Sequence, residues 1–505
     1  MTNHLYEHFV RDMPARDKVF IENADGNTVT YGGWADQSAR MANALLALGV
    51  RAGDRVAVQV DKSPEAIVLY LACLRAGAIF LPLNTAYTPT EIAYFLGDAE
   101  PRVFVCDPAD EERLKPVAAD AGVAHVLTLG VNRDGALLAR ARACAADFPD
   151  AARGPDDLAA ILYTSGTTGR SKGAMLTHEN LASNARTLVD VWRFAADDVL
   201  IHALPIYHTH GLFVATDVML LAGGTMLFLP KLDTDAILRL MPRATTVMGV
   251  PTFYTRLLAH AGLTRDAAHG MRLFISGSAP LLAETHRQWK TRTGHAILER
   301  YGMTETNMNT SNPYEGERIA GTVGLPLPGV DLRIADQTGG TTLPQGEIGM
   351  IEVRGPNVFK GYWRMPEKTA AEFRRDGFFI TGDLGKIDPQ GYVHIVGRDK
   401  DLVITGGFNV YPAEVESEID ALYGVVESAI IGLPHADFGE AVTAVVVRKP
   451  GAELNETSLL AALEGRLAKF KLPKRVLFVD DLPRNAMGKV PKNVLREQYK
   501  DLYQR

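Results

Sequence analysis

The segment from Tyr163 to Gly173, Tyr-Thr-Ser-Gly-Thr-Thr-Gly-Arg-Ser-Lys-Gly, carries residues suited to holding an anion. Glycine tolerates tight backbone angles and close approach, so backbone N–H groups and neighbouring hydroxyls can wrap a phosphate. An apolar run at 158–162 predicts a buried strand before it, and α/β proteins bind phosphates where a glycine-rich turn follows a strand. The spacing is not the Walker motif, because Ser171 and Gly173 replace its second glycine and its Ser/Thr. A solvated flexible loop is the alternative interpretation of this composition.

A second candidate site lies in Pro205-Ile-Tyr-His-Thr-His-Gly211, which follows an apolar run at 199–204. That run predicts a strand, and the C-terminal ends of strands in open α/β sheets face the ligand crevice. We therefore interpret His208 and Thr209 as pocket residues. The H-x-H spacing of His208 and His210 is one that zinc accepts, but no third ligand stands nearby at a suitable spacing, so a metal role is the weaker interpretation.

Two carboxylates, a small-residue turn and a lysine extend the set of candidates. Glu305 follows a glycine-containing turn, where it could hold a divalent cation beside a phosphate. Asp383 ends an apolar run and is placed to bind ribose hydroxyls. The turn 276–280 would let a flat ring approach the backbone, and Lys489 in a Gly-Lys pair could bring one ammonium to a remote site. Each feature alone is also typical of an ordinary surface turn.

Helical and strand patterns alternate in the first part of the chain. Apolar residues recur at helical spacing from Asp36 to Leu48, and 55–60 then predicts a strand. The same helix–strand unit returns at 64–83 and at 89–106. This alternation predicts an α/β fold in which helices cover layered, mostly parallel sheets.

The pattern changes after Arg398, where charged residues interrupt it. Short strands, a glycine pair and two helices then predict a small α+β domain. We place the domain boundary near Lys400, which divides the chain into an N-terminal domain at 1–398 and a C-terminal domain at 399–505.

The composition describes a globular protein with ample core. Its 505 residues exceed one ordinary domain, 47% are apolar, and a formal charge of −7 argues against nucleic acid or an anionic membrane as main partner. Cys73, Cys106 and Cys144 lack metal-ligand spacing and indicate a reducing compartment. No secretory signal is visible and no apolar run reaches the ~18 residues of a membrane helix, so we expect a cytoplasmic protein.

Together, six stretches resemble the acyl-adenylate-forming superfamily, which contains acyl-CoA synthetases, adenylation domains of peptide synthetases and luciferases. Any one stretch is weak evidence, but all six occur in the family's order across essentially the whole chain. The resemblance implies that a carboxylate attacks the α-phosphate of ATP in the presence of Mg²⁺, and that the thiol of coenzyme A then displaces AMP. The six stretches are 164–172, 301–305, 381–383, 397–401, 406–407 and 483–489.

The resemblance also implies roles for single residues. Lys489 would bridge the attacking carboxylate and the α-phosphate, and Glu305 would ligate Mg²⁺, whose charge offsets repulsion between two anionic reactants. The C-terminal domain would rotate about Lys400 between the half-reactions and present Gly407 to the thiol. The implied catalytic residues are Lys489, Glu305, Thr304 and His208. The residues implied to bind ATP or coenzyme A are Thr164, Ser165, Gly166, Thr167, Thr168, Gly169, Lys172, Ser278, Ala279, Pro280, Glu299, Tyr301, Gly302, Asp383, Arg398 and Gly407.

One position of the acyl pocket indicates the substrate. Relatives commonly carry a small or apolar residue where this chain has Arg300, and a buried arginine is costly without an anionic partner. With His208 on a facing strand, a second carboxylate on the substrate would be held at its far end, so we predict a short dicarboxylic acid, malonate or methylmalonate. Segments 204–213 and 299–308 also resemble malonyl-CoA synthetases, with Tyr207 in place of an expected phenylalanine. The pocket residues implied are His208, Thr209, Ser276, Arg300 and Met308, with Arg287 as a further candidate.

Other functions stay open at this point. If Arg300 pairs with an internal Glu or Asp, the enzyme would be a short-chain monocarboxylic or aryl acid-CoA ligase. A stand-alone adenylation enzyme would need a separate carrier protein, and a luciferase-like oxidase would need an aromatic pocket that Arg300 and His208 would spoil. Malonate and methylmalonate are not separated, because one methyl group changes binding by only ~1–3 kcal/mol. A lysine acetyltransferase that acts on Lys489 is a candidate partner.

Overall fold

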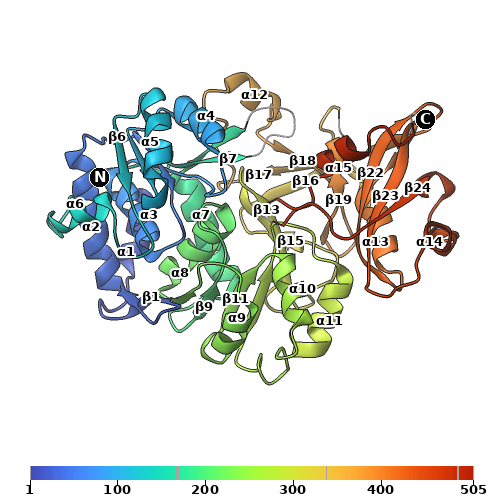
Figure 1. Ribbon diagram of the computed structural model, residues 1–505, viewed down its shortest axis with the longest axis horizontal. Helices are drawn as coiled ribbons and strands as arrows, with labels where there is room; N and C mark the ends of the chain where they lie inside the picture. The colour runs from blue at the N-terminus through green and yellow to red at the C-terminus, as the bar shows by residue number, and fades with distance from the viewer. Residues whose placement is uncertain (1, 165–170, 337, 486–487, 504–505) are drawn as a thin grey trace.

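The computed structural model describes residues 2–164, 171–336, 338–485 and 488–503. The larger part of the molecule, drawn blue to orange in Figure 1, contains three sheets with their helices, counted over these residues. A smaller part, drawn dark orange to red, contains a further sheet (Figure 1). No helix within the described ranges is long and apolar enough to cross a membrane.

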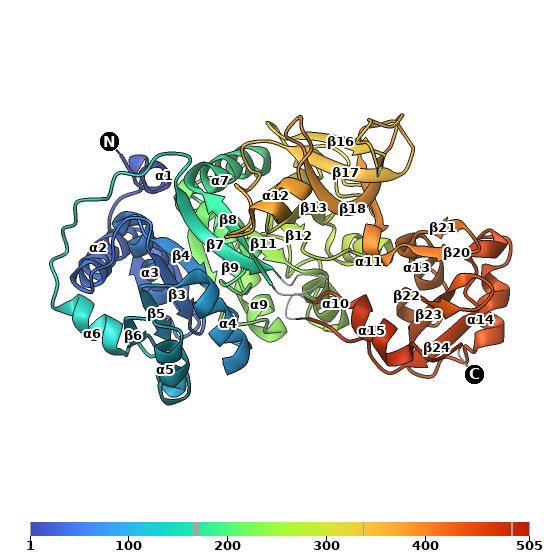
Figure 2. The ribbon, with the colours of Figure 1, turned by 90° about the horizontal axis from the view of Figure 1, so that it is seen from above.

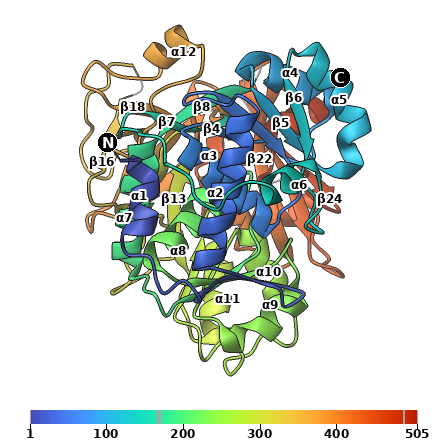
Figure 3. The same ribbon diagram turned by 90° about the vertical axis from the view of Figure 1, so that its left-hand side faces the viewer.

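The first sheet has the strand order β6-β5-β3-β4-β7-β8. Its strands are parallel except β8, which runs antiparallel to β7. Helices cover both faces, and every residue of α3 is buried; α1 and α2 lie on the outer side (Figure 3). The three helix–strand units predicted at 36–60, 64–83 and 89–106 are confirmed. The bounds are α1 (His4–Arg11), α2 (Tyr31–Ala47), β3 (Arg55–Gln59), α3 (Pro64–Ala76), β4 (Ile79–Pro82), α4 (Pro89–Ala99), β5 (Val103–Cys106), α5 (Glu111–Asp120), β6 (His125–Thr128), α6 (Ala136–Arg142), β7 (Leu158–Thr164) and β8 (Lys172–Thr177).

The second sheet has the order β15-β14-β13-β12-β11-β9-β10-β1-β2. Its middle strands are parallel, and β2, β14 and β15 add antiparallel edges. The helix predicted to start at Thr177 is confirmed, because the Thr177 side chain caps α7. The bounds are β1 (Val19–Asn23), β2 (Thr28–Thr30), α7 (His178–Trp192), β9 (Val199–His202), α8 (Asp217–Ala222), β10 (Thr225–Phe228), α9 (Thr234–Leu240), β11 (Thr246–Gly249), α10 (Pro251–Ala259), β12 (Leu273–Ser276), α11 (Ala283–Thr293), β13 (Leu298–Met303), β14 (Asn307–Ser311) and β15 (Leu325–Pro326).

The third sheet, in the order β16-β17-β18-β19, is antiparallel throughout. The sequence predicted the last two strands of this sheet. It predicted mostly parallel sheets, however, and did not predict an antiparallel one. The difference follows from the connections, because short turns such as Asp388–Tyr392 can join antiparallel strands but not parallel ones. The bounds are β16 (Asp331–Ala335), β17 (Gly349–Arg354), α12 (Pro366–Ala371), β18 (Phe379–Ile387) and β19 (Val393–Arg398).

The chain beyond residue 402 forms the α+β unit that the sequence predicts. Its sheet has hydrophobic clusters of its own, one around Val403 and Ile430 and one around Ile431 and Leu495. The short 3-10 turn Asp399–Asp401 connects it to β19, where we placed the domain boundary. The bounds are β20 (Val403–Thr405), β21 (Phe408–Val410), α13 (Pro412–Asp420), β22 (Val425–His435), β23 (Gly439–Arg448), α14 (Glu456–Leu463), β24 (Arg475–Val479) and α15 (Lys492–Tyr499).

The third sheet depends on the buried carboxylate of Glu352 in β17, which is 0% exposed and bonds Arg333 and Arg374, each at 2.7 Å. Glu352→Ala would leave two largely buried guanidinium groups without this partner, so we expect the free energy of unfolding to fall by about 3–5 kcal/mol. Asp331→Ala is the matched control, because Asp331 forms an exposed cross-strand pair with Arg354 on the same sheet and should cost about 0–1 kcal/mol. Denaturant unfolding followed by tryptophan fluorescence measures both, and equal losses would contradict the prediction.

Candidate active site

The strands β7 and β8 bring the two ends of the glycine-rich segment together. Thr164 pairs with Lys172 across the hairpin. Lys172 Nζ lies 3.1 Å from Glu372 Oε1 and 4.0 Å from the centre of the Tyr362 ring. An ion pair and a cation–π contact therefore hold the ammonium at the mouth of the segment. The predicted phosphate-binding residues Ser165, Gly166, Thr167, Thr168 and Gly169 lie outside the described residues.

Glu305 is buried between β13 and β14, with 5% of its surface exposed. The Tyr362 hydroxyl lies 3.1 Å from Glu305 Oε1 and 2.6 Å from Glu372 Oε2, so it links the two carboxylates. Burial raises the pKa of Glu305, while Lys172 and Tyr362 oppose that rise. A buried carboxylate of this kind is stabilised in its charged form by a nearby cation.

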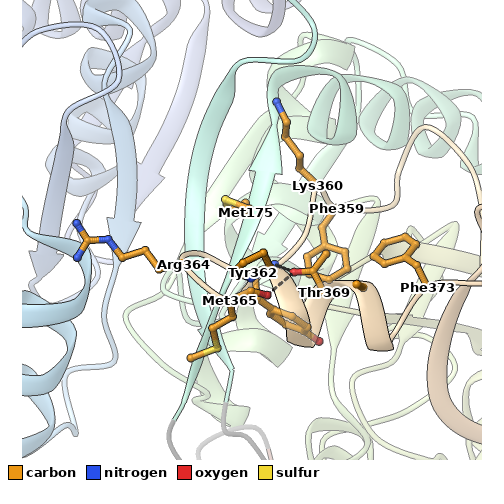
Figure 4. Close-up of a pocket in the computed structure, with 10 residues that line it drawn as sticks. Met175, Phe359, Lys360, Tyr362, Arg364, Met365, Thr369 and Phe373 are labelled. Atoms are coloured by element: carbon orange, nitrogen blue, oxygen red, sulfur yellow. Dashed lines mark hydrogen bonds between the residues drawn. The ribbon is translucent and has the colours of Figure 1, made fainter.

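The Tyr362 ring also borders an open cavity of about 590 Å³. Figure 4 shows that its walls come from β8 and from the segment that leads into and forms α12. The ammonium of Lys360 and the guanidinium of Arg364 point away from the cavity, whose surface is mainly apolar. The cavity therefore adjoins Tyr362 and, through it, Lys172 at the described end of the predicted phosphate-binding segment.

Tyr301, Asp383 and Arg398 form a second polar group. The Tyr301 hydroxyl donates to Asp383 Oδ2 at 2.5 Å, and Arg398 Nε lies 2.8 Å from Asp383 Oδ1. Asp383 and Arg398 are cross-strand partners in β18 and β19, whereas Tyr301 comes from β13 of the second sheet. Burial raises the pKa of Tyr301, which keeps the phenol protonated and able to donate. The carboxylate is thus fixed at the junction of two sheets.

The turn after β13 has little freedom. A Cβ at Gly302 would lie 1.8 Å from the carbonyl oxygen of Asn307, so the close approach of β13 and β14 requires glycine there. Thr304 is half-buried in this turn, directly before Glu305. The strands therefore fix both residues relative to Tyr301.

The turn after β12 faces β13. Ser278 has a left-handed φ of 71°, and its hydroxyl lies 3.2 Å from His210 Nδ1; Ala279 and Pro280 follow it. Glu299 Oε1 accepts a hydrogen bond from the backbone of Leu281 at 3.1 Å, and Oε2 has no partner among the described residues. Burial raises the pKa of Glu299 to about 8. These residues form a wall with one unpaired carboxyl oxygen.

Arg300 on β13 is a buried cation without a carboxylate partner in the described part of the chain. It is 3% exposed, and Nε and Nη2 have no hydrogen-bond partner within those residues. Burial lowers its pKa to about 9. Gly277 makes room for the guanidinium, because a Cβ there would lie 2.4 Å from Arg300 Cζ.

The predicted acid-pocket residues gather near this guanidinium. Two buried hydroxyls, Thr209 Oγ1 and Ser276 Oγ, find no partner among the residues described, and neither does His210 Nε2. Burial lowers the pKa of His208 to about 3, and the positive charges of Lys489 and Arg300 contribute. Met308 is buried on β14, where its backbone bonds Asn184 of α7. The pocket thus presents neutral donors and one cation.

Lys489 reaches this region from the smaller part of the molecule. The red segment before α15 extends to α10 (Figure 2), and a Cβ at Gly488 would lie 3.6 Å from the Thr252 side chain. Surrounding protein, and then Arg398, lower the pKa of Lys489 to about 8, although Asp383 and Glu305 act in the opposite direction. Lys489 is itself exposed to solvent, so it approaches these groups from the surface and does not belong to the core.

Other predicted residues lie elsewhere. Arg287, for which a solvated helix face was the preferred interpretation beside a role as substrate contact, is on the exposed face of α11, where it pairs with Glu284 at 2.9 Å because helical spacing brings the two together. Gly407 is exposed in the β20–β21 hairpin with a left-handed φ of 82°. Lys400 lies in the turn between β19 and β20.

Sequence reasoning missed three residues of the site. Tyr362 and Glu372 lie between the predicted motifs at 301–305 and 381–383, and they carry no pattern that links them to Glu305. Gly277 lies within the turn 276–280, which the sequence had indicated as a candidate. Its specific role is to leave room for the Arg300 side chain, and this contact is visible only in three dimensions.

A family model for AMP-binding enzymes matches residues 7–363, and one for the C-terminal domain of AMP-binding enzymes matches residues 414–489. The chain is an AMP-binding enzyme. The family resemblance predicted from six stretches is therefore confirmed.

Known relatives of this AMP-binding enzyme act on different acids. The chain is 34% identical to malonate–CoA ligase of Arabidopsis thaliana, covering 95% of this chain and 86% of that protein. It is 38% identical to feruloyl-CoA synthase of an Amycolatopsis species, covering 94% of each. Crystal structures of MatB from Rhodopseudomonas palustris are 64% identical over the full length of both chains, with a TM-score of 0.98 for the ATP-bound form and 0.87 for the apo form.

The contact between Gly277 and Arg300 predicts a specific defect. In Gly277→Ala the new methyl group would displace the guanidinium, so we expect kcat/KM for the acid substrate to fall by about 10- to 100-fold with little change in stability. Gly270→Ala is the control, because a Cβ at that position meets nothing within 4 Å. Steady-state kinetics and thermal unfolding measure the two effects. Unchanged kinetics in Gly277→Ala would contradict the tight contact.

Proposed function

We propose that this enzyme joins malonate, or a close dicarboxylic analogue such as methylmalonate, to coenzyme A through an acyl-adenylate. Arg300 carries the proposal. A buried guanidinium without a carboxylate partner is costly, and a substrate that brings a second carboxylate would supply that partner. The unpaired hydroxyls of Thr209 and Ser276 offer neutral donors beside it.

The alternative substrate class is a monocarboxylic or aryl acid, as the name of the feruloyl-CoA synthase relative suggests. Such an acid would leave the guanidinium of Arg300 unpaired after binding. The earlier possibility of an internal ion pair has no support among the described residues, where no carboxylate lies within ion-pair distance of Arg300. The malonate–CoA ligase relative favours the dicarboxylic class.

The reaction would proceed in two steps. A carboxylate oxygen of the acid attacks the α-phosphorus of ATP, and pyrophosphate leaves with the electrons of the broken P–O bond. The sulfur of coenzyme A then attacks the acyl carbon, and AMP leaves. Lys489 stands near Arg398, Asp383 and Glu305, where its ammonium would stabilise charge that develops on the α-phosphate.

The nucleotide would lie along the residues already described. Asp383 and Arg398 would bind ribose, Tyr301 and the 278–280 turn would contact adenine, and Thr164 and Lys172 would contact the outer phosphates.

Glu305 would hold Mg²⁺ together with those phosphates. No group of three or more metal-ligating side chains occurs in the described ranges, which fits a magnesium ion held by one carboxylate and the substrate's phosphates. The ion would offset repulsion between the two anionic reactants.

The thioester step would use a different domain arrangement. In the present one Gly407 is exposed and Lys489 stands near Arg398, Asp383 and Glu305, which suits the first step. Rotation about Lys400 would withdraw Lys489 and bring Gly407 to the thiol. Three further points stay predictions: the domain boundary at 398–400, a cytoplasmic location, and acetylation of Lys489 by a lysine acetyltransferase. The small-molecule partners would be the acid, ATP and coenzyme A.

AMP formation with malonate, methylmalonate, succinate, acetate, propionate and benzoate tests the substrate class. We expect malonate or methylmalonate to lead. Arg300→Ala should lower kcat/KM for that acid by about a hundredfold or more, because the second carboxylate of the substrate would then be buried without its partner. The Arg287→Ala variant, on the exposed face of α11, is the control. A wild-type preference for monocarboxylates would overturn the dicarboxylate proposal.

The pKa of Lys489 predicts a pH dependence. The ammonium form is required, and it is lost as pH rises through about 8, so kcat/KM for ATP in the adenylation step should fall above that pH. Lys489→Arg keeps the charge and should move this loss to higher pH. Pyrophosphate exchange without coenzyme A measures the step free of thiol ionisation. A flat profile up to pH 10 in the wild type would argue against the assignment.

A further inference from the structure

Lys62 is a cation in an unusual place, at the junction of the first two sheets. It follows β3 and directly precedes Ser63, the N-cap of α3. Its Nζ lies 2.9 Å from His202 Nδ1, 2.8 Å from the His202 carbonyl oxygen and 2.7 Å from the Leu229 carbonyl oxygen. It also lies 4.2 Å from the centre of the Phe228 ring. Within the described residues no carboxylate forms an ion pair with it.

The hydrogen bonds around Lys62 fix its protons and those of His202. His202 Nε2 lies 2.9 Å from the Gly211 carbonyl oxygen, which can only accept, so Nε2 must carry a proton. Burial, and then Lys62, lower the pKa of His202 well below its ordinary value, so the ring is neutral and Nδ1 must accept. Lys62 Nζ therefore faces three acceptors. Although burial also lowers the pKa of Lys62, only the ammonium has three protons to donate to them.

The bond from His202 ends at the segment that forms the acid pocket. Gly211 belongs to the π-helix His210–Thr216, a form of helix that is often found at functional sites. Its carbonyl also accepts from the Thr216 hydroxyl at 2.9 Å. A Cβ at Gly211 would lie 2.1 Å from the Pro205 carbonyl oxygen, so the chain folds tightly back on itself here.

The residues next to Gly211 are those that face Arg300. The backbone N–H of Leu212 donates to the His208 carbonyl at 3.0 Å, and that of His210 donates to His208 Nδ1 at 3.2 Å. A displacement of Gly211 would therefore move the imidazoles of the pocket.

We propose that Lys62 is a positioning residue for the acid pocket: it holds His202 in the Nε2–H tautomer, and His202 in turn holds Gly211 and the 208–210 segment in place. The role of the pocket rests on the proposed function. Lys62 does not contact the reacting atoms, and it acts through the chain of bonds from its ammonium to Nδ1 and from Nε2–H to the Gly211 carbonyl.

A purely structural role is the competing explanation, since Lys62 also ties two sheets together through backbone carbonyls. The chain offers a matched control in Lys18, whose Nζ bonds the carbonyl oxygens of Ala196 and Gly223 at the opposite end of β10. Lys18→Met removes an ammonium bonded to backbone carbonyls of the same sheet, but it touches no histidine.

Kinetics of Lys62→Met and Lys18→Met separate the two explanations. The acid used is the one that the wild-type enzyme prefers in a panel of mono- and dicarboxylic acids, so the test does not depend on its being malonate. We expect Lys62→Met to raise KM for that acid about tenfold, the size of effect of a lost hydrogen bond to a charged group, and to change KM for ATP less than about twofold. Lys18→Met should change neither constant, even if it lowers the melting temperature. Equal KM shifts for acid and ATP, or an unchanged KM for the acid, would overturn the proposal.

A second measurement needs no variant. Neutron diffraction from the wild-type crystal locates the protons directly, and we expect a proton on His202 Nε2, none on Nδ1, and three on Lys62 Nζ. A proton on Nδ1 would overturn the proposal even if the variant failed to fold. A wild-type enzyme that prefers a monocarboxylic acid would overturn the dicarboxylate assignment alone. The kinetics of Lys62→Met and the proton positions around His202 would still test the positioning role of Lys62.

Discussion

Positive charges converge in this enzyme, and the internal carboxylates of Asp383 and Glu305 balance them only in part. Arg300 and Lys489 both lower the pKa of His208, and Arg398 and Arg300 lower that of Lys489. Repulsion between these positive charges costs free energy, and this cost falls when anions bind among them. Under the proposed function the reactants would supply such anions, since ATP and a carboxylic acid both bring negative charge. The folded structure therefore has to hold together cations that repel one another. The buried sheets that carry these residues provide the necessary rigidity.

Under the proposed function, one strand would divide the two reactants. Successive side chains of β13 point to opposite faces, so Glu299 and Tyr301 share one face and Arg300 takes the other. Tyr301 meets the Asp383 carboxylate of the third sheet, whereas Arg300 lies over Gly277 beside the acid pocket. The predicted nucleotide side and the predicted acid side would thus be two faces of the same backbone. A shift of register by one residue in β13 would exchange them, and the tight contact at Gly302 prevents such a shift.

Local signals explain what the sequence could predict. The N-cap Ser63 with Pro64 and the C-terminal Gly77 delimit α3, and the Thr177 cap starts α7, because capping depends on near neighbours. The strand β8 was not predicted. Its Gly173 favoured a loop, yet a Cβ there would lie 2.9 Å from the Ile161 side chain, so the pairing with β7 itself requires glycine. Lys62 was also missed, since a lysine in a polar turn before a helix is usually solvated, and only its fit between two sheets sets it apart. The sequence left open whether Arg300 has an internal partner, and that question is one of three-dimensional distance.

The fit of Gly277 against Arg300 orders the changes that evolution can make. A side chain at 277 and the present position of the Arg300 guanidinium exclude each other, because a Cβ at 277 would lie 2.4 Å from Arg300 Cζ. A lineage in which the guanidinium takes this position needs glycine at 277 first, and one that keeps the guanidinium there cannot enlarge 277 without moving it. If Arg300 sets the acid specificity as proposed, paths of single substitutions therefore pass in either direction through a chain that has glycine at 277 and no arginine at 300. An engineer who transplants the arginine alone into a relative with a larger residue at 277 meets the same barrier.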